Sequence, residues 1–184
     1  MKFIQDNTIY IRQSPSVIDY INKLQLYIVG CYQLISDQNI GDSLDLKRIN
    51  NRLGCLLLFD EKQNQIDDHE CFDGGVFDIK FFDDDQSSTQ FAVAHSNGQI
   101  AIYSIELQKI ELIKRINSES SLLTCLEMID KSILCGDSLG NLIHVKTFEN
   151  DEFDLQKIHL TKLDEQLWCI NGFRIENEKL VFVG

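Results

Sequence analysis

The side chains that could perform acid–base chemistry lie where predicted strands end in turns. His95 stands directly before a Ser-Asn-Gly turn, and Asp137 stands 42 residues later, before a Ser-Leu-Gly turn. A repeat of this length places equivalent residues on one face of neighbouring units, where the two side chains can approach each other. Because proton transfer by a positioned histidine or carboxylate is a common catalytic device, His95 and Asp137 are the candidate catalytic residues. The sequence does not identify a complete catalytic set.

The same turns also have a structural interpretation, because Asp at such a position commonly caps backbone N–H groups. The other histidines are interpreted as solvated or structural residues: His69, His144 and His159. The sequence has no G-x-S-x-G element, phosphate-binding loop or metal-ligand cluster, so we expect no cofactor and no metal. The cysteines form no C-x-x-C pair and are expected to be reduced core residues: Cys31, Cys55, Cys71, Cys125, Cys135 and Cys169.

The elements that position these residues are short strands. Alternating apolar and polar residues between Gly74 and Asn117 predict strands at 76–81, 91–95, 99–105 and 109–116. The Asn97-Gly98 dipeptide that separates the second from the third is typical of a turn with positive φ. Four strands in about 44 residues are the size of one β-propeller blade.

The same unit recurs along the chain. After it come predicted strands at 122–128, 133–136, 141–148 and 153–160, and Gly140 follows Gly98 by 42 residues. Four more strands are predicted before the first unit, at 16–21, 24–34, 54–60 and 65–71. Two more are predicted after the second unit, at 167–173 and 180–184. We therefore predict an all-β, WD40-type β-propeller that is incomplete, with about three and a half four-stranded blades. The blades are expected at about 15–72, 74–117 and 121–160, with the start of a fourth at 166–184.

Three features lie outside this regular pattern. Residues 35–52 are rich in Asp, Asn, Ser and Gly and are expected to be a disordered insertion within the first blade. Residues 8–11 are expected to form a short extra strand. Because a seven-bladed ring needs roughly 300 residues, we expect the chain to be the N-terminal half of a longer propeller or a truncated copy of one.

Charge and hydropathy narrow the classes of partner. The net charge of −12 argues against nucleic acid, which requires a basic surface. Solubility is the simple explanation of that charge, and a basic protein partner is the alternative. No apolar run approaches 18 residues and no signal-peptide pattern is present, so we expect a cytoplasmic protein without a membrane partner.

Several stretches, in one order along the chain, resemble the diphthine methyl ester hydrolases, which are WD-repeat proteins of diphthamide biosynthesis. The first stretch is Cys31-Tyr32-Gln33-Leu34, which is followed by the insertion and by residues 52–59. Residues 75–80 are similar to a strand of that family, with Phe81 where tryptophan is usual. The stretches at 92–100, 135–140, 168–173 and 181–184 also resemble the family pattern, so the resemblance covers roughly residues 16–184.

One stretch departs from the family pattern. The family usually carries a histidine and a glutamate before the tryptophan that corresponds to Trp168, and here Leu163 and Gln166 take their places. His159 lies four residues too early to replace that histidine without a shift of the loop. If the family's histidine and glutamate serve catalysis, this chain has lost it; if they only complete the blade, nothing is lost.

The resemblance implies a carboxylic-ester hydrolase that acts on translation elongation factor 2. It would remove a methyl ester from methylated diphthine, a modified histidine, so that an ATP-dependent amidation can follow. Such a reaction needs an activated nucleophile or water and donors for the oxyanion, which the sequence does not identify. The alternatives are a WD-repeat interaction scaffold without catalysis, because most such propellers are scaffolds, and an inactive truncated copy.

Overall fold

The computed structural model describes residues 8–34, 52–71, 74–82, 89–120, 122–129, 132–147, 153–159, 166–175 and 178–183. The first sheet contains β1 (Ser14–Ile21), β2 (Leu26–Leu34), β3 (Arg52–Asp60) and β4 (Gln65–Cys71). The second contains β5 (Val76–Phe81), β6 (Gln90–His95), β7 (Gln99–Glu106) and β8 (Lys109–Asn117). The third contains β9 (Leu123–Ile129), β10 (Ser132–Asp137), β11 (Asn141–Thr147) and β12 (Phe153–His159), and the last pairs β13 (Ile170–Ile175) with β14 (Glu178–Val183).

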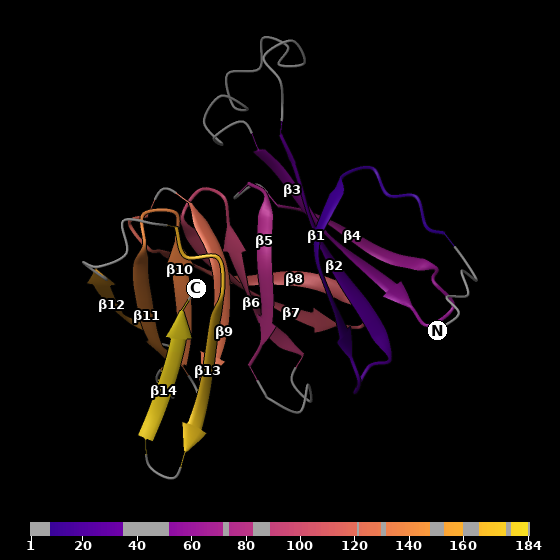
Figure 1. Cartoon of the computed structure of the whole chain (residues 1–184). Coiled ribbons are helices and arrows are strands. Elements are labelled where there is room, and N and C mark those ends of the chain that lie inside the picture. The colour runs from indigo at the N-terminus through magenta and orange to yellow at the C-terminus, as the bar shows by residue number, and fades with distance from the viewer. Residues whose placement is uncertain are drawn as a thin grey trace, which may run out of the picture.

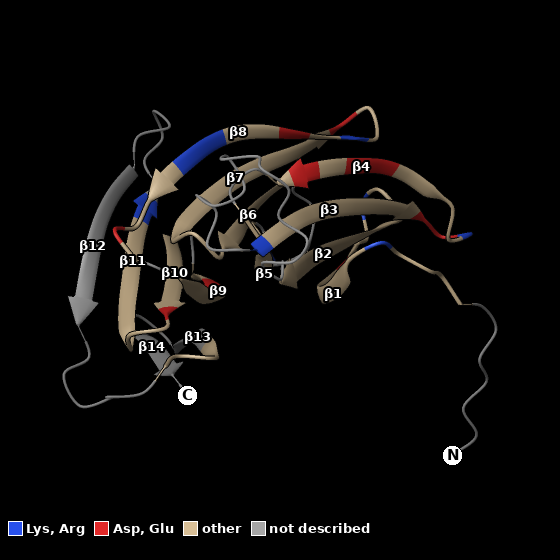
Figure 2. Cartoon of the chain, turned by 90° about the horizontal axis from the view of Figure 1, so that it is seen from above, with Lys and Arg blue, Asp and Glu red and all other residues tan. Residues whose placement is uncertain are grey.

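The sheets are consecutive blades, called blades 1 to 4 below. Each four-stranded blade is antiparallel, and its strands are paired in chain order. The first strands of successive blades lie beside one another, β1 by β5, β5 by β9 and β9 by β13. The blades therefore fan out from these inner strands, as Figure 1 and Figure 2 show. This arrangement is that of a β-propeller, and the blades that the structure describes form an arc rather than a closed ring.

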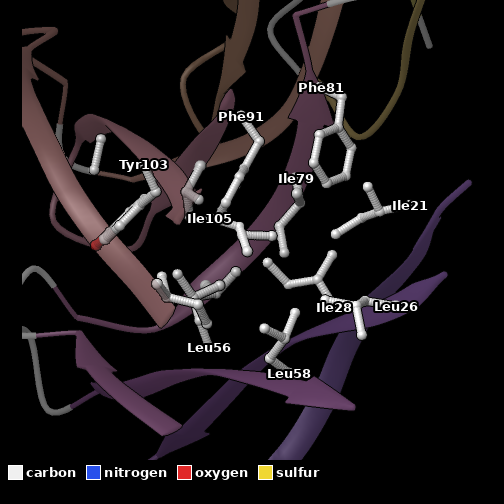
Figure 3. Packing of buried hydrophobic residues seen from close by; sticks show 14 of the residues in the cluster. Ile21, Leu26, Ile28, Leu56, Leu58, Ile79, Phe81, Phe91, Tyr103 and Ile105 are labelled. Carbon is white, nitrogen blue, oxygen red and sulfur yellow. The ribbon is translucent and has the colours of Figure 1, made fainter. Parts of the chain in front are cut away.

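Side chains from facing sheets fill the space between the blades. In β6, Phe91 and Val93 face blade 1, whereas Ala92 and Ala94 face blade 3, as the two-residue period of a strand requires. Figure 3 shows the first of these cores, in which Ile28 and Leu56 of blade 1 meet side chains of blade 2. Full burial of a side chain of this size contributes about 1.5–3 kcal/mol, so contacts between blades hold the fan together.

Each of the three four-stranded blades carries the same irregularity at the start of its first strand. The pairing register shifts around Ser16 in β1, around Phe77 in β5 and around Thr124 in β9. Ser16 donates a hydrogen bond to Val76 O of the next blade, 2.6 Å away. Thr124 bonds to Leu167 O in the same way. A β-bulge turns one side chain away from the regular alternation of the strand. At two of these bulges, the hydroxyl of the bulged residue bonds to the segment of the next blade.

The structure differs from the expected elements in several places. The third strand begins at Arg52 rather than at 54, so Arg52 belongs to β3 and not to the expected insertion, and β13 begins at Ile170 rather than at 167. Residues 8–11 form no strand. The second strand begins at Leu26 rather than at 24, because a turn closed by the bond from Leu24 N to Ile21 O and a positive φ at Gln25 precede it. The insertion at 35–52 lies outside the described residues except for Arg52. Nowhere in the described ranges is there a helix with the length and apolarity needed to cross a bilayer.

Candidate functional site

His95 and Asp137 occupy equivalent turns, as the repeat predicts. Gly98 N donates to His95 O over 3.1 Å, and Gly140 N donates to Asp137 O over 3.2 Å. The two glycines have φ values of 82° and 78°, in the left-handed region that favours glycine. The turn that contains Asn97 is therefore a four-residue turn with one positive φ, at its glycine, rather than the two-residue turn that Asn-Gly commonly forms.

The His95 side chain is buried beneath the loop that leads into β5. Its Nδ1 lies 3.3 Å from Gly74 O, and since a carbonyl oxygen can only accept, Nδ1 carries a proton. Its Nε2 lies 3.5 Å from the hydroxyl of Tyr103, whose ring stacks on Phe91. The imidazole thus ties a loop of blade 2 to the core that Tyr103 shares with blade 1.

The Asp137 carboxylate is also buried, and it accepts several hydrogen bonds. Its Oδ1 accepts from Leu139 N and Asn141 N, and its Oδ2 accepts from Ser120 Oγ and Asn141 Nδ2 at 2.7 and 2.6 Å. Burial acts to raise the pKa of Asp137, but the hydrogen bonds to the ionised form outweigh it and leave the pKa below the ordinary value. This carboxylate caps its turn and fastens the loop that enters blade 3.

The two candidates therefore play matching structural parts. Each joins its turn to the segment that enters the first strand of the same blade, His95 through Gly74 and Asp137 through Ser120. Parallel backbone bonds run from Ser96 N to Gly75 O and from Ser138 N to Leu122 O. With both side chains 0% exposed, neither presents a face to solvent. Their assignment to catalysis stays a prediction.

The remaining sequence candidates are dispersed. His69 is half-buried, with its ring at an edge-on angle to Tyr103, 5.3 Å between centroids, and His144 is half-buried in β11. Gln166 is exposed, whereas Leu163 and the side chain of His159 lie outside the described part. Among the described residues, no three potential metal ligands lie together.

Sequence reasoning missed a cluster at the same end of the propeller, where β2, β3 and β5 meet. Tyr32 and Phe77 stack with 5.4 Å between ring centroids. Gly75 packs against Tyr32 and Arg52, since a Cβ at Gly75 would lie 2.7 Å from Tyr32 Cβ and 3.6 Å from Arg52 Cβ. The Nε of Arg52 is buried without a hydrogen-bond partner. We call these residues, Tyr32, Arg52, Gly75 and Phe77, the aromatic corner.

The aromatic corner breaks the internal repeat. Blades 1 and 3 place a hydroxyl at the bulge, Ser16 and Thr124, and that hydroxyl bonds to the next blade. Blade 2 places Phe77 there, against Tyr32. An alignment of the blades by strand register pairs Phe77 with Ser16 and Thr124 and so reveals this departure. The sequence alone does not give that alignment, because the positions of the bulges cannot be recognised in it. A stacked aromatic pair beside a guanidinium can hold an aromatic or carboxylate-bearing group.

Comparisons with known proteins support the fold. No family model matches the sequence, and no curated protein matches it. Among solved structures, Sqt1 of Chaetomium thermophilum is similar with a TM-score of 0.63 and 12% identity, over 87% of this chain and 39% of that one. A chain of the COPII outer coat vertex on membranes is similar with a TM-score of 0.51 and 17% identity, over 72% of this chain and 33% of that one.

These likenesses concern architecture. The chain spans about a third of the COPII chain and 39% of the Sqt1 chain, both of which are WD40 β-propellers. Together with the antiparallel blades, they confirm the predicted fold class, a WD40-type propeller whose described blades do not close. At 12 to 17% identity they carry no argument about activity.

Proposed function

We propose that this chain is part of a propeller of the diphthine methyl ester hydrolase type, which removes the methyl ester from methylated diphthine on elongation factor 2. The observation that carries the proposal is that the two motifs most specific to this family lie next to each other in the structure. The Cys31-Tyr32-Gln33-Leu34 stretch ends β2, and residues 75–80 open blade 2. Although more than 40 residues separate them, Tyr32 of one stacks on Phe77 of the other.

The chemistry of the substrate suits that corner. Methylated diphthine is a substituted imidazole with a carboxylic ester, so it offers a ring that can stack and an oxygen that becomes negative during hydrolysis. The Tyr32 and Phe77 rings would accept the ring, and the half-buried guanidinium side chain of Arg52 would donate to the developing oxyanion. Arg52 is the positioned donor in this proposal, and the attacking water and its base lie among residues still to be identified.

Mass spectrometry of the modified histidine tests the proposal. The protein is incubated with elongation factor 2 that carries methylated diphthine, and loss of the methyl group is followed. We expect turnover by the full-length wild-type propeller, little turnover by residues 1–184 alone, and a loss of about 10²–10³-fold in kcat for Arg52→Gln in the full-length protein, the usual effect of removing one oxyanion donor. The matched control is Arg115→Gln on β8, at the opposite edge of the blade 2 sheet from β5. Full-length wild-type protein that leaves the methyl ester intact contradicts the proposal.

A second candidate function, a protein-interaction scaffold without catalysis, is favoured by the use of His95 and Asp137 in structural contacts. Apolar side chains are exposed at the end of blade 3, with Leu139 and Trp168 62% and 58% exposed. The turn that holds Leu139 and the segment that holds Trp168 are joined by the bond from Leu167 N to Asp137 O. With a net charge of −12, the partner of such a scaffold would be basic.

The two candidates differ in a binding experiment without turnover. A scaffold of this kind binds its partner through Trp168 and Leu139, so Trp168→Ala should weaken an isolated complex by about tenfold or more, as expected of an exposed aromatic anchor. The esterase proposal instead predicts that Arg52→Gln lowers turnover while binding of elongation factor 2 persists. Binding without turnover, abolished by Trp168→Ala, would favour the scaffold.

A further inference from the structure

Cys31 and Cys55 lie directly opposite each other on neighbouring antiparallel strands. They are register partners in β2 and β3, and both thiols are buried on the face of blade 1 that points away from blade 2. Directly opposed residues of antiparallel strands have Cα atoms about 4.5–5.5 Å apart, and disulfides span about 4.4–6.8 Å. The backbone therefore already holds these two cysteines at bridging distance.

The thiols also interact with each other and with a cation. The two thiols affect each other's acidity, and Arg12 acts on that of Cys55. The hydrogen bond from Cys31, aided by the positive charge of Arg12, lowers the pKa of the Cys55 thiol against the effect of burial. That hydrogen bond and burial raise the pKa of the Cys31 thiol. Of the two thiols, Cys55 is therefore the more acidic and Cys31 the less acidic.

The cover over this pair is thin. Residues 8–13 cross the face without belonging to a strand. The ion pairs from Arg12 to Asp68 and Glu70, at 3.1 and 3.4 Å, involve exposed side chains and are each worth about 0–1 kcal/mol. Ion pairs of this strength oppose local opening of the segment only weakly.

Two cavities lie along this segment, on either side of Cys31 on the same face of β2. One, of about 470 Å³, is apolar and is lined by Val29, the residue that precedes Cys31 on the same face of β2. The other, of about 490 Å³, is lined by Gln33, the next residue on that face, and by Arg12 and Gln13. The amide oxygen of Gln13 is buried without a hydrogen-bond partner. The second cavity thus presents a cation and an unused acceptor to a charged peptide-like ligand.

We propose that Cys31 and Cys55 form a thiol–disulfide exchange site for a low-molecular-weight peptide disulfide such as glutathione disulfide. The Cys55 thiolate attacks one sulfur of the disulfide, whose S–S bond breaks, and the leaving glutathione thiolate takes up the proton that Cys55 released. The Cys31 sulfur then loses its proton, attacks Cys55 and releases the second glutathione as a thiol. The protein dithiol loses two electrons and two protons, and glutathione disulfide gains them.

The test uses the full chain with Cys169→Ser, which removes the exposed cysteine. The folded protein is equilibrated with mixtures of reduced and oxidised glutathione, alkylated and mapped by mass spectrometry. We expect a Cys31–Cys55 linked peptide whose fraction follows a single two-electron equilibrium as the glutathione ratio changes. In Cys31→Ser the reaction should stop at one glutathione adduct on Cys55, and Cys55→Ser should leave Cys31 unmodified.

Cys125 and Cys135 are the matched controls, because they are buried in a blade without a cysteine opposite and should remain reduced. Arg12→Gln should slow the first step several-fold while the linked peptide still forms. Three outcomes would overturn the proposal: no linked peptide under native conditions, equal modification of Cys125 and Cys135, or oxidation that appears only in denaturant.

Discussion

At the scale of single residues, Asp137 shows that a side chain predicted to be catalytic can instead be needed to stabilise a turn. Asp137 combines a buried carboxylate, four accepted hydrogen bonds and a link to the preceding loop. Each of these features also occurs in active sites, and a lowered pKa alone does not separate the two cases. What separates them is a measurement of stability, because a turn-capping carboxylate contributes to folding whether or not a substrate is present.

We predict that Asp137→Asn lowers the free energy of unfolding by about 1–3 kcal/mol at pH 7, because it replaces an acceptor of hydrogen bonds by a partial donor. The pKa of Asp137 is lowered in the folded state, so its contribution is fully present above the unfolded-state pKa of about 3.9. It is lost as the pH falls through the folded-state pKa. Urea unfolding at several pH values should show the gap between wild type and variant closing below about pH 4.

The control for this experiment is Glu111→Gln, an exposed position on β8. It should leave the free energy of unfolding within about 0.5 kcal/mol of wild type at every pH. An Asp137→Asn variant as stable as wild type at pH 7 would show that the turn does not need its carboxylate, and the catalytic interpretation would regain weight.

Gly98 gives a second prediction at this scale. It has a φ of 82°, and a Cβ there would lie 1.6 Å from the carbonyl oxygen of Ser120. We expect Gly98→Ala to lower the free energy of unfolding by about 2–4 kcal/mol, because left-handed strain adds to a clash with backbone. Chemical denaturation measures the loss. The matched change Ala94→Gly, in the strand that enters the same turn, should cost only about 1 kcal/mol, and equal losses would contradict the steric argument.

At the scale of elements, the hairpin between β7 and β8 departs from the turn chemistry of its neighbours. Leu107 and Gln108, its two central residues, both have positive φ, at 50° and 64°, and Glu106 pairs with Lys109. Two-residue turns of this shape favour Asn-Gly. Leu107 is moreover 99% exposed, so no packing compensates the strain. The hairpin is held by the sheet on either side rather than by its own residues.

We therefore predict that Leu107→Asn combined with Gln108→Gly raises the free energy of unfolding by about 1–2 kcal/mol, by relieving strain at two residues. Thermal and urea unfolding measure the gain. The same dipeptide placed at Lys114 and Arg115, within β8, should instead be destabilising, because strand interiors disfavour Asn and Gly. A neutral or harmful effect at the hairpin would show that these φ values cost nothing here.

At the scale of the whole molecule, the blades bury one another's faces, and blade 1 retains a face that no described blade covers. Its apolar cavity of about 470 Å³ is lined by Ile18, Tyr27, Val29 and Phe59, among others. Ile18 is 66% exposed on β1, which is the inner edge of its sheet. Because exposed apolar surface along a sheet edge favours association, we expect this face to promote association of the chain.

We predict that Ile18→Lys reduces the fluorescence of a bound hydrophobic dye and the light scattering of concentrated protein. It should change the free energy of unfolding by no more than about 0.5 kcal/mol, because the side chain is largely in solvent. Ile113→Lys on β8, 51% exposed and away from the cavity, is the control. If both variants reduce dye binding and scattering equally, the effect arises from net charge rather than from this face.

Local features of the sequence determined the strands, the turns and the blade repeat. Alternation along 76–81 and 99–105, and glycines at 98 and 140, act through neighbouring residues, so their consequences can be predicted without knowledge of the fold. The matching roles of His95 and Asp137 followed from the same repeat, although their contacts did not. Which side chains meet across blades was decided by tertiary structure alone.

The physical reason is that a β-bulge changes which face a residue occupies, and no short-range pattern reports it. The bulge at Phe77 is what turns that ring toward Tyr32, and the register of β2 with β3 is what sets Cys31 against Cys55. Both juxtapositions join residues far apart in sequence through backbone pairing. The sequence by itself therefore determined the propeller, and only the folded chain decided the aromatic corner and the paired thiols.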